Sequence, residues 1–201
     1  MEKLSKTSRV VNRFVKIVRG LCIGFGIACI VLLVIAIVLP ESQYYRLVNL
    51  SDMSVTLGNV EYHLTRPLEP TGPIRPAVCM ILFSAAVSLG LGAWGLGLLY
   101  QILAPMAEQR PFEGSVSANL KRLGWVSLAA AVFSLITEPL MELLSMKMFD
   151  LEQLFAPGLI AGYTVEGSVE LSLFLVPALL FILSYVFQYG EELQRQSDET
   201  L

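Results

Sequence analysis

Charged side chains are scarce in this sequence: Asp, Glu, Lys and Arg make up 15% of its 201 residues, against 55% hydrophobic residues. A water-soluble domain of this length needs more charged and polar side chains to cover its surface. The net charge is only −3, and the basic residues are confined to a few places, so direct binding to nucleic acid is not expected. The composition predicts a protein whose solvent is largely lipid.

Residues that commonly ligate metals or catalyse reactions are also few. His63 is the only histidine, and Cys22, Cys29 and Cys79 all fall inside apolar runs. The sequence has no CxxC pair, no H-E-x-x-H, no Gly-rich phosphate loop after a strand, and no Ser or Cys with an evident base. We therefore expect no enzymatic activity, no cofactor and no metal site. The cysteines are expected to be buried free thiols that pack as small apolar side chains.

Long hydrophobic runs are what the sequence has in abundance. A helix of about 20 mostly apolar residues crosses a hydrocarbon core of about 30 Å. Four runs meet this length, at 17–39, 77–104, 123–145 and 169–189. The first ends Val38-Leu39-Pro40-Glu41 rather than in a cleavage site, so we interpret it as an uncleaved signal-anchor. The predicted fold is all-α transmembrane: a four-helix membrane bundle forming one integral membrane domain over 1–201.

The distribution of Lys and Arg predicts the orientation of these helices. Basic residues gather before or at the start of the first run, in the loop 105–122 and in the tail 190–201, whereas the other two loops hold only Arg46, Arg66, Arg75 and Lys147. Cytoplasmic loops carry the excess of basic residues, so both termini and the loop 105–122 are predicted to be cytoplasmic. Residues 8–19 form either a basic amphipathic helix on the anionic leaflet or an ordinary basic flank.

The predicted outer loop, 40–76, has a pattern typical of strands. Apolar and polar residues alternate over Met53–Leu57 and again over Val60–Leu64, and Gly58-Asn59 lies between the two stretches. Alternation on both sides of such a pair indicates a β-hairpin with a tight turn. We expect a small extracytoplasmic β-hairpin between the first and second helices, packed on the helix ends or on a partner, because an isolated hairpin is marginally stable.

Small residues recur at every fourth position on the first two predicted helices. Between helices in lipid, close approach of the backbones through small side chains contributes more than hydrophobic burial does. We therefore expect these stripes at helix–helix contacts, either within one chain or at the seam of a homo-oligomer. The stripes are Gly20, Gly24 and Ala28 on the first helix, and Ser84, Ser88 and Gly92 on the second.

Four carboxylates lie near the predicted outer ends of the third and fourth helices. Glu138 and Glu142 are four residues apart, as are Glu166 and Glu170. If the two helices are neighbours, the carboxylates surround one outer vestibule, with Arg75 as a counter-charge, and the vestibule binds a cation or a cationic ligand. The alternative is that all four lie among the lipid headgroups, solvated or in ion pairs. The sequence leaves both interpretations open.

Two short stretches carry a family resemblance. The loop reads Arg110-Pro111-Phe112 and then Asn119-Leu120-Lys121-Arg122-Leu123-Gly124-Trp125, and the fourth run ends Val186-Phe187-Gln188-Tyr189-Gly190. These stretches resemble motifs of a bacterial four-helix membrane family catalogued as domain of unknown function 2975. The chain departs from that family at Tyr185, where the family often has an acidic residue.

The resemblance implies a cellular location and a binding partner. It implies the cytoplasmic membrane of a bacterium, and, because family members are often encoded beside small helix-turn-helix regulators, a soluble regulator as a cytoplasmic partner. The matched residues form a candidate partner surface: Arg110, Pro111, Phe112, Asn119 and Arg122. In this interpretation Ser115 caps a short helix before the third span, and Gly190 ends the fourth helix.

Three functions fit these features. The first is a non-enzymatic membrane protein that senses or regulates, through the outer hairpin and the cytoplasmic loop. The second is a small transporter or channel subunit that uses the outer carboxylates. The third is an immunity or stress protein that acts by association alone. The middles of the first three runs are almost wholly apolar, Pro177 is the one strong helix break in the fourth, and no repeat is visible, which favours the first function.

Overall fold

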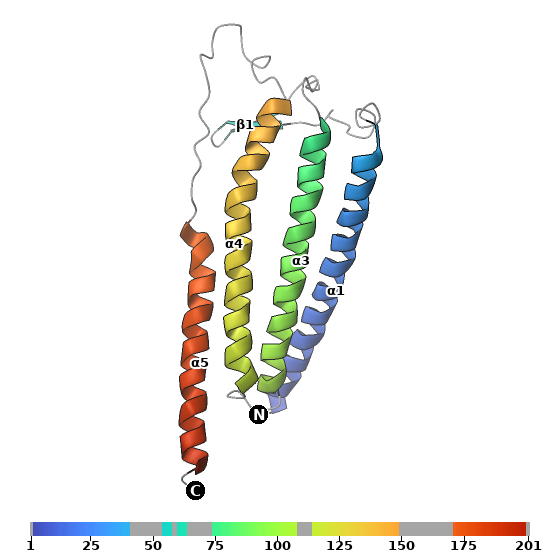
Figure 1. The fold of residues 1–201 in the computed structure, drawn as a ribbon. Helices are drawn as coiled ribbons and strands as arrows, with labels where there is room; N and C mark the ends of the chain where they lie inside the picture. The colour runs from blue at the N-terminus through green and yellow to red at the C-terminus, as the bar shows by residue number, and fades with distance from the viewer. Residues whose placement is uncertain are drawn as a thin grey trace. The chain divides into compact units, whose positions relative to one another are not determined.

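The computed structural model describes the backbone of residues 2–40, 54–57, 60–63, 74–107, 114–148 and 171–199, and the side chains of 11–40, 74–105, 116–144, 172–197 and 199. The elements can be followed in Figure 1. In chain order they are α1 (Glu2–Val38), β1 (Ser54–Leu57), β2 (Val60–His63), α3 (Ile74–Ala107), α4 (Gly114–Met148), the 3-10 helix η3 (Leu171–Phe174) and α5 (Leu175–Glu199).

Four helices in the described part of the chain are long and apolar enough to cross a membrane. Their candidate spans are Val11–Val38, Ile74–Pro105, Val116–Leu144 and Ser172–Ser197. Large apolar side chains stay exposed on all of them, for example Ile27, Phe83, Ile136 and Ile182. Such side chains are favourable in lipid and unfavourable in water. The prediction of four helices long and apolar enough to span a membrane is confirmed, and such helices fit a multi-pass membrane protein.

The helices extend beyond the predicted spans, and Pro105 does not end α3. Helix α3 continues through Pro105 to Ala107, and α4 begins at Gly114, so most of the predicted loop 105–122 is helical. The short helix expected after Ser115 is the first part of α4 itself. Pro105 lies in the last turn of α3, where its missing N–H removes one backbone hydrogen bond without ending the helix. Pro177 lies in the first turn of α5, where its missing N–H also costs little, so it does not break the fourth span.

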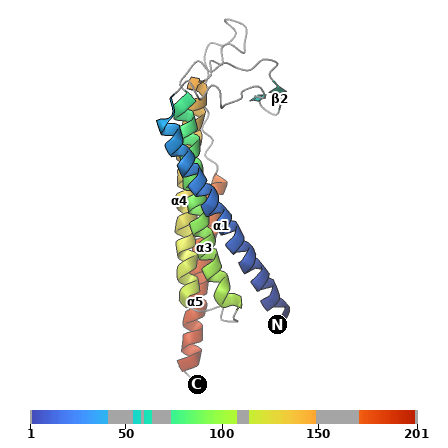
Figure 2. The same ribbon diagram turned by 90° about the vertical axis from the view of Figure 1, so that its right-hand side faces the viewer.

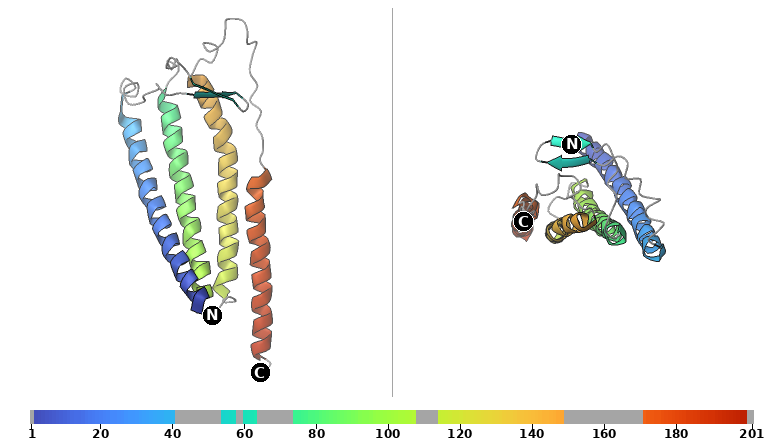
Figure 3. Two further views of the ribbon diagram at one scale, coloured as in Figure 1. Left: turned by 180° about the vertical axis from the view of Figure 1, so that it is seen from behind. Right: turned by 90° about the horizontal axis from the view of Figure 1, so that it is seen from above.

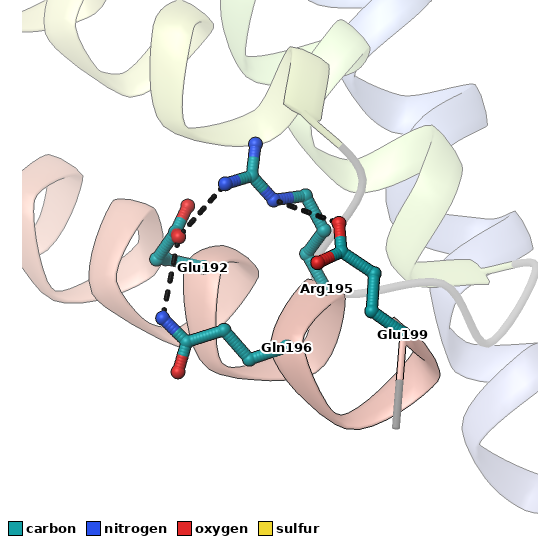
Figure 4. Close-up of polar contacts among 4 residues, drawn as sticks. All are labelled: Glu192, Arg195, Gln196 and Glu199. Carbon is teal, nitrogen blue, oxygen red and sulfur yellow. Dashed lines mark hydrogen bonds and ion pairs between the residues drawn. The ribbon is translucent and has the colours of Figure 1, made fainter. Parts of the chain in front are cut away.

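The predicted end of the fourth helix at Gly190 is wrong. Helix α5 continues through this glycine to Glu199. Glycine inside a helix is less favourable than alanine by about 1 kcal/mol, but it does not stop a helix by itself. Charged side chains beyond it support the helix: Arg195 Nη2 lies 2.9 Å from Glu192 Oε1, and Arg195 Nε lies 3.7 Å from Glu199 Oε1 (Figure 4). Pairs at these spacings stabilise exposed helices slightly.

The two strands lie in the region where the alternation predicts them. β1 and β2 pair antiparallel, with Leu57 opposite Val60 and Ser54 opposite His63, and Figure 3 shows them side by side. Gly58 and Asn59, and the side chains of the strands, lie outside the described residues. The complete hairpin, its packing and its extracytoplasmic position therefore stay predictions.

The chain divides into two compact units, and each is described by itself. Unit 2 comprises Cys29–Ser84 and Ile136–Gly167. In unit 2, Ala36 of α1 and Ile74 of α3 form a buried cluster, against which Leu39, Val78, Cys79 and Leu82 pack. This cluster joins α1 to α3. Cys29 and Cys79 are free, half-buried thiols, and Cys79 packs against this cluster.

Unit 1 comprises Met1–Ala28, Ala85–Leu135 and Ser168–Leu201. Its buried cluster brings together Ile102 of α3 with Val116 and Leu120 of α4, and Leu180 and Phe187 of α5 pack against it. The helices of unit 1 can be followed in Figure 2. The cluster accounts for the association of α3, α4 and α5, since each helix contributes side chains to it.

The contact between α1 and α3 in unit 1 uses a different set of small residues from the predicted stripes. A Cβ at Gly26 would lie 3.7 Å from Leu89 Cβ, and Val15, Cys22 and Gly26 lie on the buried or half-buried face of α1. Gly20, Gly24, Ala28, Ser88 and Gly92 are exposed, and no atom lies within 4 Å of a Cβ added at Gly20, Gly24 or Gly92. Ser84, in unit 2, is half-buried and donates only to Ile81 O of its own helix, at 3.0 Å. These stripes do not supply the α1–α3 contact of unit 1, and contact with a second copy stays a prediction.

A close contact between α4 and α5 depends on the absence of a side chain. A Cβ at Gly124 would lie 2.9 Å from Cε1 of Phe181, closer than real Cβ atoms approach. The neighbouring Trp125 meets the same ring edge-on, with centroids 5.4 Å apart. Phe181 therefore occupies the space that any other residue at position 124 would fill, and the ring is too rigid to move aside cheaply.

The first prediction concerns this fit. We expect Gly124→Ala to lower the free energy of unfolding by about 1–3 kcal/mol, because overpacking forces the Phe181 ring or the α5 backbone to shift. Gly20→Ala is the matched control: it has open space and should be neutral or stabilising by up to about 1 kcal/mol. Reversible unfolding of the purified protein in mixed micelles measures both. Equal effects of the two substitutions would contradict the fit.

Candidate functional site

A polar contact joins α4 to α5 inside unit 1. Ser117 Oγ donates to Glu191 Oε2 at 3.1 Å, and Ser184 Oγ donates to the backbone carbonyl of Ser117 at 2.9 Å. Ser184 is 7% exposed, and Ser117 and Glu191 are half-buried. Ser184 and Glu191 are seven residues apart, so they lie on the same face of α5. We call these three residues the α4–α5 polar contact.

The local sequence explains why these polar groups pair. A hydroxyl or carboxylate between helices in an apolar surrounding is unfavourable unless it is hydrogen-bonded. Ser117 provides a hydroxyl donor and a backbone acceptor. On α5, Glu191 provides the acceptor and Ser184 the donor, about two helical turns apart. Interhelical hydrogen bonds in membranes contribute about 0.6–2 kcal/mol each. The contact therefore specifies the register of α4 against α5 more than it adds stability.

Beyond this contact α5 is an exposed, charged helix. Glu192 accepts from Arg195 at 2.9 Å and from Gln196 Nε2 at 3.3 Å, and Arg195 also pairs with Glu199 (Figure 4). These side chains have polar partners on their own helix and stay open to solvent on the outer side. Such a surface suits reversible contact with a polar partner rather than burial in lipid.

Just before the charged segment, α5 exposes two aromatic side chains. Tyr185 and Tyr189 are 74% and 63% exposed, and with Gln188 and Glu192 they line an open hollow of about 300 Å³. Tyrosines are enriched where a membrane helix enters the headgroup region, because the ring is apolar and the hydroxyl is polar. Their place fits an exit of α5 from the hydrocarbon close to Gly190. Glu191–Glu199 continues from there as helix.

The candidate partner surface is only partly in the described residues. Arg122 is exposed on α4, one residue after exposed Lys121. Asn119 is 6% exposed and therefore lies on the buried face of α4, not on a surface that a partner can reach. The reason is its spacing: Val116, Asn119 and Leu120 share one helical face, and that face packs inward. Arg110, Pro111 and Phe112 lie outside the described residues.

Only part of the predicted outer vestibule also lies within the described residues. Glu138 and Glu142 have exposed side chains on α4, and Arg75 is half-buried on α3. Glu166 and Glu170 lie outside the described residues. No group of three or more His, Cys, Asp or Glu side chains that could hold a metal ion occurs among the residues that are described. The cation vestibule stays a prediction.

Comparison with known proteins does not assign this chain to a family. No protein family, curated protein or solved structure matches this chain. The functional assignment therefore depends on the geometry of the helices and on the physical chemistry of their surfaces.

Sequence reasoning missed the α4–α5 polar contact. Ser117 and Glu191 lie just outside the predicted spans and are 74 positions apart in the chain. One feature of the sequence could have indicated it: Ser184 carries a hydroxyl inside an apolar run, seven residues (about two turns) before Glu191. Polar residues at that spacing within a span indicate a face that meets another helix.

The second prediction tests the coupling of these residues. We expect Ser117→Ala and Glu191→Ala to be non-additive, with a coupling free energy of about 0.5–1 kcal/mol in a double-mutant cycle. Ser88→Ala, at an exposed position of α3, should show no coupling to Glu191→Ala. Unfolding in mixed micelles provides the four free energies of each cycle. Additive effects at Ser117 and Glu191 would show that the hydrogen bond contributes nothing.

Proposed function

We propose that this chain is a non-enzymatic, multi-pass membrane protein that holds a soluble regulatory partner on its cytoplasmic face. The observation that carries the proposal is the unbroken course of α5 from Leu175 through Gly190 to Glu199. An apolar membrane helix that continues as an exposed, charged helix couples the membrane part to whatever binds its polar end. A flexible tail would not transmit a change in the position of the helix.

The α4–α5 polar contact supports this role. It ties Glu191, at the start of the charged segment, to Ser117 of α4, so the polar end of α5 and the first turns of α4 are held together. Lys121 and Arg122 are exposed on the same segment of α4. Basic residues on α4 and acidic residues on α5 then form one mixed-charge surface within unit 1. We propose that a small helix-turn-helix regulator, which the family resemblance implies, binds this surface.

The proposed orientation places this surface in the cytoplasm of a bacterial cell. Ten of the 14 Lys and Arg residues belong to the segments of unit 1, which include the start of α1, the end of α3, the start of α4 and all of α5. Basic residues are retained on the cytoplasmic side during insertion. The outer loop, with its strands, and the outer carboxylates would then receive a signal on the other side.

The third prediction tests the orientation. Green fluorescent protein fused after Leu201 should be fluorescent, and alkaline phosphatase at the same point should be inactive, because the phosphatase folds only after export. Alkaline phosphatase inserted near residue 155, between α4 and η3, should be active. The reverse pattern at the two sites would place unit 1 outside the cytoplasm and would remove the proposed surface from any soluble regulator.

The fourth prediction tests the partner. A photo-crosslinking amino acid at Lys121 or Glu199 should capture one soluble protein with a DNA-binding domain in living cells, because both positions are exposed on the proposed surface. Ile136, an exposed apolar position of α4, is the control and should capture lipid.

Charge reversal provides the second arm of this experiment. Arg195→Glu replaces the cation that pairs with Glu192 and Glu199 by an anion, and should reduce capture from Lys121 several-fold through like-charge repulsion. Capture of lipid alone from all three positions would contradict the proposal. Solute flux through liposomes that contain the protein would then favour the alternative, a small transporter or channel subunit.

A further inference from the structure

Two cations of α1 lie on α3 along one edge of the contact between these helices. Lys16 Nζ lies 4.7 Å from the centroid of the Tyr100 ring. The Arg19 guanidinium lies against Gly97, where an added Cβ would be 3.1 Å from its Cζ and 3.3 Å from Nη1. The contacts are spaced by three residues on both helices, so the cations are stacked one helical turn apart.

Gly97 is what admits the guanidinium. A Cβ at this position would approach the guanidinium more closely than nine in ten real Cβ contacts, so the group would have to shift by a few tenths of an ångström if position 97 carried a side chain. Tyr100 provides the second support, through attraction between the ammonium and the face of the ring. Both cations are thereby held in place while their side chains remain exposed.

No acidic side chain neutralises these cations in the described part of the chain. The ion pairs seen there belong to Arg195, at the far end of α5. A cation among apolar residues is unfavourable without a counter-charge. Ile23, one turn beyond Arg19 on the same face of α1, is 45% exposed, and Trp94, one turn before Gly97 on α3, is 61% exposed. Side chains of a helix point toward its N-terminus, so Arg19 reaches back toward the level of Lys16.

The counter-charge that these cations lack among the described side chains can be identified by its chemistry. A guanidinium presents a rigid fork of donors that suits two oxygens of a phosphate, and an ammonium one turn away adds a second charge. A soluble phosphate would leave the neighbouring apolar side chains uncovered, whereas the acyl chains of a phospholipid cover exposed side chains such as Ile23 and Trp94. Anionic lipids are present in the membranes that such proteins occupy.

We propose that Lys16 and Arg19, seated on Tyr100 and Gly97, form a binding site for the phosphate headgroup of an anionic phospholipid, in the leaflet that holds the N-terminal half of α1. The lipid neutralises both cations, and its acyl chains lie against the exposed apolar side chains beside them. This site is independent of the partner surface on α4 and α5.

Lipid binding to the full-length protein tests the proposal. Native mass spectrometry from detergent, with phosphatidylglycerol or phosphatidylcholine added, measures the dissociation constant of the first bound lipid. We expect phosphatidylglycerol to bind at least about tenfold more tightly, and Arg19→Gln to remove most of that preference, because a charge-assisted bidentate contact is lost. Arg13→Gln removes the same charge from an exposed position of α1 that lies away from α3, and should change the preference less than twofold.

A second substitution tests the contact of the Arg19 guanidinium with Gly97 without changing any charge. Gly97→Ala should displace the guanidinium and weaken phosphatidylglycerol binding by about threefold or more, whereas Gly92→Ala, which has open space, should not. Circular dichroism shows whether each variant remains helical. Equal losses for Arg13→Gln and Arg19→Gln, or no preference for the anionic lipid, would overturn the proposal. Competition by water-soluble glycerol phosphate at similar concentration would also overturn it, since the acyl chains would then contribute nothing.

Discussion

Inside a bilayer, a backbone N–H or carbonyl group without a hydrogen bond costs several kcal/mol, and no water is present to satisfy it. This constraint explains why the helices of this chain are long and why residues that often end helices do not end these. Pro139 lies inside α4, nine residues before the helix ends. It weakens the helix locally, but an interruption there would expose several backbone groups instead of one.

The same solvent removes most of the hydrophobic gain from bringing helices together, because lipid is as apolar as a leucine side chain. Association then depends on how closely the backbones and side chains fit. Glycines lie where the fit is closest: Gly26 on Leu89, Gly95 on Leu123, and Gly124 on the Phe181 ring. A Cβ at Gly95 would be 3.5 Å from Leu123 Cδ1, which is ordinary contact, whereas one at Gly124 would overlap the ring. The α4–α5 contact is therefore the least tolerant of change.

The solvent also determines how much could be predicted from the sequence. Apolar runs of span length mark the helices, because lipid requires them, and the strand alternation marks the region of β1 and β2. Which face of a helix meets another helix is much harder to predict, since lipid-facing and protein-facing residues are both apolar. On α1 the stripe Gly20, Gly24 and Ala28 looks as suitable as Cys22 and Gly26, yet only the second set faces α3.

Residues of the candidate site also differ in whether their positions could be predicted from the sequence. Arg122 is exposed as its charge predicts, because a charged group is most stable in water or among headgroups. Asn119 is buried although it is polar, because its position is determined by the helical spacing of Val116 and Leu120. The extension of α5 depends on the spacing of Glu192, Arg195 and Glu199, which an apolar-run criterion ignores.

Glycines and polar groups have complementary roles at the helix contacts of unit 1. Gly26 and Gly124 allow the helices to approach closely, because steric contact tolerates only small changes of distance. Steric fit between smooth apolar helices does not by itself prevent one helix from sliding along another. Directional contacts do: Lys16 on the Tyr100 ring holds α1 against α3, and the Ser117–Glu191 hydrogen bond holds α5 against α4. Because these polar contacts lie near the ends of the apolar runs, they also connect the register of the helices to the groups that water, headgroups and soluble partners can reach. A displacement of α5 along α4 would therefore have to break the Ser117–Glu191 contact before it changed the exposed surface beyond Gly190.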